Sequence, residues 1–229
     1  MQGELEDAFA RLLGERVGVT GAGRTDAGVH ATGQVISFRS ATRLPEATIE
    51  RGANALLPAD VAVSDVEAVD EAFHARFSAT ARTYEYTIWN GPRPRPLLRR
   101  TAWWVPERLD VAAMDRAASG LVGTRDFASF AMKGAGSRER TVRRASWGAR
   151  DGVLVFAIEA DGFLRGMVRG IVGTHVRIGR GKIDPDAIGE IIAAADRERG
   201  GPSAPAHGLC LVAVRYEGAT RGRDDEEDE

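Results

Sequence analysis

Apolar side chains recur at helical spacing in the first residues of the chain. Leu5, Phe9 and Leu12 fall on one face of a helix with 3.6 residues per turn, and Gly14 is a typical helix stop. The same reasoning predicts four further helices, over residues 45–56, 109–122, 161–179 and 184–195. Because glycine inside a helix costs up to about 1 kcal/mol relative to alanine, Gly166 predicts that the helix over 161–179 begins later or approaches another backbone closely.

Alternation of apolar and polar residues predicts the strands. It is strongest over residues 83–89, which are rich in aromatic and β-branched side chains. Further strands are expected at residues 34–38, 60–69, 138–147, 153–160 and 206–216. Gly152 separates two of these strands and predicts a hairpin. The order of helices and strands is typical of an α+β fold with mainly antiparallel pairing.

Arginine supplies nearly all of the positive charge. The chain has 229 residues and a formal net charge of -2, and its only lysines are Lys133 and Lys182. Residues 221–229 hold two arginines and six acids, so the rest of the chain carries a net positive charge. Guanidinium groups match phosphate geometry better than ammonium groups do, which favours an anionic partner. The acidic end has no apolar residues and is expected to be disordered.

Several classes of protein are excluded by residues that the chain lacks. Cys210 is the only cysteine, so there is no internal disulfide, and no apolar run approaches the length of a membrane span. With no visible signal peptide, the sequence predicts a cytoplasmic protein without membrane association. The four histidines share no metal-ligand spacing, and neither a Walker loop nor a dinucleotide fingerprint occurs.

A glycine-rich loop carries the most promising chemistry. Arg24 and Asp26 lie among Gly21, Gly23 and Gly28, directly before the strand expected at 34–38. If this segment is extended, the two charged side chains leave the same face, and the arginine favours the ionised carboxylate. Asp26 is then a nucleophile or base with an arginine partner. The alternative is an ordinary turn, in which aspartate bonds to its own backbone.

Two further groups of arginines are candidates for phosphate contact. One lies in the loop over residues 90–100, which also holds three prolines and is the expected boundary between two halves of the chain. The other opens the strand that ends near Trp147 and comprises Arg138, Arg140, Arg143 and Arg144. So many arginines without matching acids favour RNA binding, although a solvated strand face is the simpler interpretation.

Five segments together resemble one family, the TruA-type tRNA pseudouridine synthases. The longest is GRTDAGVH from Gly23 to His30, followed by a further Gly-Gln-Val. FHARFSATAR at 73–82 leads into Tyr84 and is similar to the second motif of the family. DFASF at 126–130, FLRGMVRGIVG at 163–173 and GLCLVAV at 208–214 complete the likeness, which runs from the first helix to about Tyr216.

The resemblance implies a fold, a reaction and a set of site residues. The fold would be two ferredoxin-like halves with joined sheets, here 1–100 and 101–217, followed by an acidic disordered tail at 218–229. The reaction would be isomerisation of uridine to pseudouridine at positions 38 to 40 of the tRNA anticodon arm, without a cofactor. Family members also have a further strand and loop before the first helix, and they form homodimers.

The family assigns roles to five positions of this chain. Asp26 would be the nucleophile, attacking either the sugar or the base, and Arg169 would pair with it. Arg24 would hold Asp26, fill the space left by the extruded base or bind phosphate. Tyr84 would stack on the base and move a proton, and Leu209 would lie against the base. The alternative function is a non-catalytic RNA-binding protein of similar architecture, although no RNP-type aromatic motif is present.

Overall fold

The computed structural model describes residues 1–132, 137–217 and 219–222, and the chain forms two compact units. Unit 1 comprises Met1–Gly23 and Val35–Ser78, and unit 2 comprises Arg24–Gln34 and the chain from Ala79 onward. The loop that carries Asp26 therefore belongs to unit 2, although the residues on both sides of it belong to unit 1. This division differs from the one expected in the loop over 90–100, and the two similar halves stay a prediction.

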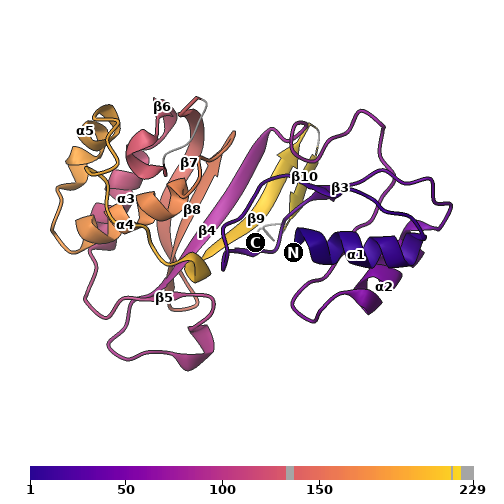
Figure 1. The fold of residues 1–229 in the computed structure, drawn as a ribbon. Coiled ribbons are helices and arrows are strands. Elements are labelled where there is room, and N and C mark those ends of the chain that lie inside the picture. Colours follow the sequence, from indigo (N-terminus) through magenta and orange to yellow (C-terminus); the bar gives the residue numbers. More distant parts are fainter. Residues whose placement is uncertain (133–136, 218, 223–229) are drawn as a thin grey trace, which may run out of the picture. The chain divides into compact units, whose positions relative to one another are not determined.

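Unit 1 contains two helices beside a short two-stranded sheet (Figure 1). The helices are α1, Gln2–Leu13, and α2, Glu46–Leu56, as the apolar spacing predicted. Gly14 ends α1 in the left-handed conformation with φ 72°, which glycine adopts without steric cost. The sheet pairs β1, Thr20–Gly21, with β3, Ile36–Ser37, in antiparallel fashion. The helices bury their apolar faces in one core, formed by Leu5, Phe9, Val17, Val19, Ile49 and Ala53.

The prediction of a strand at residues 60–69 is wrong, because this segment has no regular structure. Its valines at 61, 63 and 66 still pack against the core of unit 1. The side-chain amide of Asn54 donates to the Val63 carbonyl at 2.7 Å and accepts from the Val63 amide at 2.8 Å. A side chain on α2 thus satisfies the backbone groups that a neighbouring strand would otherwise bond, so the alternating valines stay partly buried without joining a sheet.

Unit 2 is built on a large sheet whose main strands run in the order β10-β9-β4-β8-β7-β6. All neighbours along this order are antiparallel, which confirms the α+β class. The strands are β4 Ala81–Trp89, β6 Gly123–Asp126, β7 Glu139–Arg150, β8 Val153–Ala160, β9 Leu209–Tyr216 and β10 Ala219–Gly222. Two short strands pair in parallel beside them: β2 His30–Ala31 with β9, and β5 Trp103–Trp104 with β4.

Three helices of unit 2 gather beside β6, β7 and β8 (Figure 1). They are α3 Val111–Ser119, α4 Met167–Gly179 and α5 Ile188–Ala193. Four single turns of 3-10 helix connect elements: η1 Pro96–Leu98, η2 Ala128–Phe130, η3 Pro185–Ala187 and η4 Ala206–Gly208. His175 of α4 contacts the rings of Trp147 and Phe156, so α4 covers the apolar face of the β7–β8 hairpin. None of the helices in the described part of the chain is long and apolar enough to cross a membrane.

Glycine residues explain where α4 begins and how closely it packs. Gly166 caps α4 in the left-handed conformation at φ 73°, so the helix begins at Met167, as its glycine indicated. Further along, a side chain at Gly170 would lie 2.3 Å from the Phe130 carbonyl, so the expected close backbone approach also occurs. The predicted hairpin is confirmed, with Asp151 and Gly152 both at positive φ in its turn.

The expected disordered tail at 218–229 falls mostly outside the described residues. Within it, the backbone of Ala219–Gly222 pairs with β9 as strand β10, so the expectation does not hold for these four residues. The glycines of residues 133–137 predict a flexible stretch, and its positions 133–136 also lie outside the described residues.

Candidate active site

Asp26 begins a tight turn. The amide of Val29 donates to the Asp26 carbonyl at 3.0 Å, and Gly28 has φ 82° at the third position of the turn. A turn with positive φ at this position requires glycine or asparagine. The Ala-Gly pair after Asp26 therefore reverses the chain and leads directly into β2.

Strand β2 holds this loop to the large sheet. His30 pairs in parallel with Cys210 of β9, and the amides of Thr32 and Gly33 both donate to the Leu211 carbonyl, at 3.0 and 3.1 Å. A side chain on Gly33 would lie 2.1 Å from the Val212 carbonyl oxygen, so only glycine allows this approach. The glycines of the motif thus fix where the Asp26 loop meets β9.

Two different arginines hold the two oxygens of the Asp26 carboxylate. Arg169 Nη1 lies 3.1 Å from Oδ2, and Arg165 Nε lies 3.8 Å from Oδ1. The side chains of Asp26 and Arg169 are 28% and 22% exposed, whereas Arg165 is 73% exposed. The Oδ2 contact is therefore part of the packed structure, and the Oδ1 contact faces solvent and is screened by it.

Arg169 is fixed by a second set of contacts on the first turn of α4. Its Nε donates to the Ala204 carbonyl at 2.7 Å, and its own carbonyl accepts from the Ala204 amide at 3.0 Å. A guanidinium group can bond a carbonyl and a carboxylate at the same time because its donors point in different directions. Arg169 is thus oriented toward Asp26 before any substrate is present.

Tyr84 provides a buried aromatic side chain close to this carboxylate. It is 8% exposed, and its ring packs edge-on against Phe163 with 5.1 Å between centroids. Burial raises the pKa of Tyr84 to about 12; the charge of Arg82 opposes this shift, while those of Asp26 and Cys210 add to it. The phenol is therefore neutral at physiological pH. Its hydroxyl makes no hydrogen bond to any of the described residues, so it is available to a ligand.

Arg24 does not form the expected ion pair with Asp26. Arg24 is exposed and makes no hydrogen bond or ion pair within the described residues. The segment around it is not a strand, so the expected alternation that would place Arg24 and Asp26 on one face does not apply. Arg169 and Arg165 are the ion-pair partners of Asp26 instead.

Leu209 is buried at the start of β9, where it lies opposite Tyr86. The register between β4 and β9 shifts by one residue after Thr83, so that Leu211 in place of Val212 lies opposite Tyr84. The hydroxyl of Tyr86 donates to the Pro205 carbonyl at 2.8 Å, close to the segment that orients Arg169. The contact of Leu209 with a bound base stays a prediction.

The four arginines of β7 and its approach differ from one another. Arg143 forms an ion pair with Glu159 at 3.8 Å, and Glu159 also pairs with Arg215 at 3.3 Å, so this arginine does have a matching acid. The side chains of Arg138 and Arg144 make no contact of this kind within the described residues. Arg140 lies beside Gly162, where an added side chain would be 3.4 Å from its Nε. That position is next to Phe163, whose ring packs on Tyr84.

Sequence reasoning missed three contributors to the site. Arg165 was not singled out, although it lies four residues before Arg169 and thus one helical turn away in a helix pattern. Phe163 lies within the helix predicted over 161–179, but it precedes α4 and packs on Tyr84. Ala204 acts through its backbone, and no pattern of side chains signals such a role.

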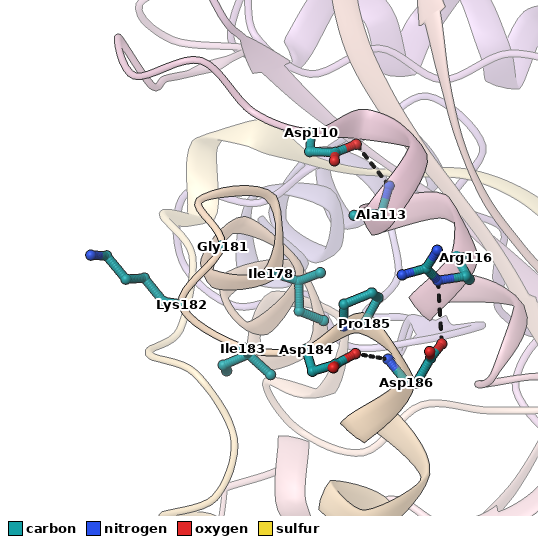
Figure 2. Close-up of a pocket in the computed structure, with 10 residues that line it drawn as sticks. All are labelled: Asp110, Ala113, Arg116, Ile178, Gly181, Lys182, Ile183, Asp184, Pro185 and Asp186. Carbon is teal, nitrogen blue, oxygen red and sulfur yellow. Dashed lines mark hydrogen bonds and ion pairs between the residues drawn. The ribbon is translucent and has the colours of Figure 1, made fainter.

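A surface pocket lies at the other end of α4 (Figure 2). Its lining includes Ile178 and Gly181, and an exposed ion pair joins Arg116 to Asp186 at 3.2 Å. At 1.5 Å per residue, Ile178 is about 14 Å along the helix from Arg169. Two acids of the pocket cap local turns. Asp110 accepts a hydrogen bond from the Ala113 amide, and Asp184 accepts one from the Asp186 amide. Within the described residues, no group of three or more side chains could hold a metal ion.

The geometry around Asp26 defines a class of site. A half-buried carboxylate is held between two guanidinium groups, next to a neutral phenol on a rigid sheet. A carboxylate in such a position can act as a nucleophile or as an electrostatic stabiliser, and guanidinium groups match the geometry of phosphate. This arrangement fits an enzyme that acts on a planar, phosphate-bearing molecule.

Comparison with known proteins gives the family. A family model described as tRNA pseudouridine synthase matches residues 1–78 and 117–217. The tRNA pseudouridine synthase A of Moorella thermoacetica is 47% identical, over 94% of this chain and 89% of that protein. The proteins of the same name from Roseiflexus castenholzii and Geobacter sulfurreducens are 47% and 44% identical, over 94% of this chain and 82% and 89% of their own lengths. The chain belongs to the tRNA pseudouridine synthase family and is an isomerase acting on RNA.

Proposed function

We propose that this protein converts uridine to pseudouridine at positions 38 to 40 of the tRNA anticodon arm, with Asp26 as nucleophile. The observation that carries the proposal is the carboxylate of Asp26, which two arginines orient next to the buried Tyr84. The relatives are named for tRNA, and that substrate class supports the choice of tRNA here. The positions within tRNA rest on the family resemblance of the motif around Asp26.

The reaction rearranges two bonds within one nucleotide. The N1–C1′ glycosidic bond breaks, the detached base turns, and a C5–C1′ bond forms while the C5 proton leaves and N1 gains a proton. Atoms and electrons balance without an external oxidant or reductant, so no cofactor is needed. Asp26 attacks either C1′ of the ribose or C6 of the base, and both routes form and then release a covalent bond to the carboxylate.

The two arginine contacts support different roles for the two oxygens of the Asp26 carboxylate. Oδ2 is bound to Arg169, which is itself anchored to Ala204, whereas Oδ1 meets, among the described residues, only the exposed Arg165. We assign the attack to Oδ1, since displacing a solvent-exposed arginine disturbs less structure. Arg169 then keeps the carboxylate in position and stabilises it when the covalent bond breaks.

Tyr84 is suited to contact with the flat face of the base. Stacking of a base on an aromatic side chain contributes roughly 1–3 kcal/mol. Because its pKa is raised to about 12, Tyr84 enters the reaction as a neutral phenol. If it moves the C5 proton, it must pass on its own proton in the same step. A target inside a stem must also be extruded, at a cost of a few kcal/mol, and the exposed Arg24 is free to enter the vacated space or bind phosphate.

The oligomeric state and the location in the cell are also proposals. Members of this family form homodimers by the resemblance described above, and we propose the same assembly for this chain. We also propose a cytoplasmic location, which the single cysteine and the tRNA-modifying relatives support.

The deciding experiment uses the purified chain and an unmodified tRNA transcript that contains uridine at positions 38, 39 and 40. Pseudouridine is then mapped by position. We expect product at one or more of these positions and none in an Asp26→Asn reaction. Product only at other positions would contradict the anticodon-arm assignment. Tight binding of tRNA without any product would instead favour the alternative of a non-catalytic RNA-binding protein.

A further inference from the structure

A short turn in unit 1 holds an aromatic ring in solvent. The turn runs from His74 to Ser78, where the Ser78 amide donates to the His74 carbonyl at 2.9 Å. The His74 amide donates to the Ser78 hydroxyl at 3.0 Å, which closes the turn from the other side. The His74 ring nitrogen Nδ1 accepts from the amides of Arg76 and Phe77, both at 3.2 Å. Four hydrogen bonds therefore fix the backbone of a five-residue segment.

The turn is anchored to the small sheet of unit 1. Ala75, in the middle of the turn, is fully buried. Its amide donates to the hydroxyl of Ser37 in β3 at 3.1 Å. Because the turn is bonded internally and tied to a strand, the residue after Arg76 has little freedom to retract from solvent.

Phe77 is the residue that this turn presents. It is 76% exposed, with the His74 ring 4.4 Å from its centroid at an angle of 32°. The Arg76 guanidinium lies 5.4 Å from the same centroid. Exposed apolar residues are common by themselves. What is unusual here is a ring that stays exposed on a turn held by four hydrogen bonds, with a histidine ring against it and an arginine over it.

We propose that Phe77 is a stacking platform for an unpaired nucleobase of the RNA substrate, with Arg76 contacting the phosphate beside that base. The proposal rests on the proposed action on tRNA. An aromatic face next to a guanidinium group is the chemistry by which proteins bind unpaired bases without reading their sequence. The positive charge favours RNA over an apolar protein surface as the occupant. A turn that is already ordered also lowers the conformational entropy lost on binding.

The test compares substitutions at Phe77 in the full-length protein, with the tRNA transcript used above. Phe77→Ala removes the ring, Phe77→Leu keeps an apolar side chain without a π-face, and Phe77→Tyr restores the ring. Val69→Ala, at another exposed apolar residue of unit 1, is the matched control. For each variant we would measure Kd at several salt concentrations, pseudouridine formation, thermal melting and oligomeric state.

We expect Phe77→Ala and Phe77→Leu to weaken tRNA binding by about 5- to 150-fold, the range that one stacked base contributes. The slope of log Kd against log salt should not change, because no charge is removed. Phe77→Tyr and Val69→Ala should bind like the wild type, and all variants should melt as it does. A transcript with a fluorescent base analogue in the anticodon loop should lose its quenching in Phe77→Ala.

Three outcomes would overturn the stacking assignment. One is wild-type affinity in Phe77→Ala, and another is full affinity in Phe77→Leu, which would indicate simple apolar contact. The third is a changed oligomeric state in Phe77→Ala, which would place the ring in a contact between protein copies. Each of these leaves pseudouridine formation by the wild-type protein intact. If the wild type itself neither binds nor modifies tRNA, the proposed function fails and not only the platform.

Discussion

His175 should make the stability of this protein fall steeply in mild acid. The imidazole is fully buried on α4, and its Nδ1 accepts a hydrogen bond from the Trp147 indole nitrogen at 2.9 Å. The rings of Trp147 and Phe156 pack around it, and its Nε2 has no partner among the described residues. Protonation would break the Trp147 bond and leave a cation without a counter-charge. Burial alone lowers the pKa of His175 from 6.5 to about 3.

The magnitude follows from this difference between the folded and unfolded states. Below pH 6.5 the unfolded chain binds a proton that the folded chain does not, so stability is complete above pH 6.5 and is lost as the pH falls toward 3. Each pH unit in this window costs about 1.4 kcal/mol, which gives about 2.5 kcal/mol between pH 7 and 4.5 and about 5 kcal/mol in total. That is a large share of the 5–15 kcal/mol by which ordinary domains are stable.

Urea unfolding at several pH values between 7 and 4.5 measures the effect, with His175→Asn as the comparison. Asparagine keeps an acceptor near the position of Nδ1 but does not titrate. We expect the variant to be less stable at pH 7, because it leaves a space in the core, yet to lose stability less steeply by about 1.4 kcal/mol per pH unit below pH 6. Other titrating groups are common to both proteins and cancel. Parallel curves for the two proteins would refute the reasoning.

The remaining predictions concern the RNA-modifying site. Asp26→Asn should abolish pseudouridine formation and leave the Kd for tRNA within about threefold, because its carboxylate has no alternative in the site; substantial residual turnover would remove it from the mechanism. Arg165→Ala should raise KM more than it lowers kcat, with recovery in Arg165→Lys. Arg169→Lys should lower kcat, because Arg169 reaches Ala204 and Asp26 from two separate nitrogens and lysine has only one. Neutralising arginines of β7 and its approach should flatten the log–log salt slope by about 0.7–0.9 for every phosphate that is no longer bound, and an unchanged slope would indicate only a solvated face. The group to neutralise for this test is Arg138, Arg140 and Arg144.

Local patterns predicted most elements of the fold. The helices that begin near Gln2 and Glu46, the β7–β8 hairpin and the late start of α4 all follow from periodicity or from glycine. The strand expected at 60–69 failed for a tertiary reason, because Asn54 bonds the backbone of Val63 in place of a strand. Periodicity reports which side chains are buried, and it does not report what the backbone bonds to.

For the candidate site, patterns within short stretches of sequence likewise predicted only part of what the structure shows. The resemblance of motifs led to Asp26, Arg169 and Tyr84, and the structure brings these three together. Reasoning from spacing alone paired Asp26 with Arg24, its near neighbour in sequence, and that pair does not form. Charges two residues apart are close only if the backbone is extended, whereas the actual partners come from α4 and the residues just before it, more than 130 positions away. No pattern within a short window contains that information.

The position of the Asp26 carboxylate depends on a closed series of contacts within unit 2. Arg169 binds the carboxylate and the Ala204 carbonyl, and the next residue, Pro205, accepts the hydroxyl of Tyr86. Tyr86 belongs to β4, which pairs with β9, and β9 carries the short strand β2 into which the Asp26 turn leads. Each contact is a single hydrogen bond or a short ladder, but the series returns to its starting point. Displacement of Asp26 relative to Arg169 must therefore break a contact elsewhere in the series, which explains how an exposed, glycine-rich loop can hold a carboxylate in a defined orientation.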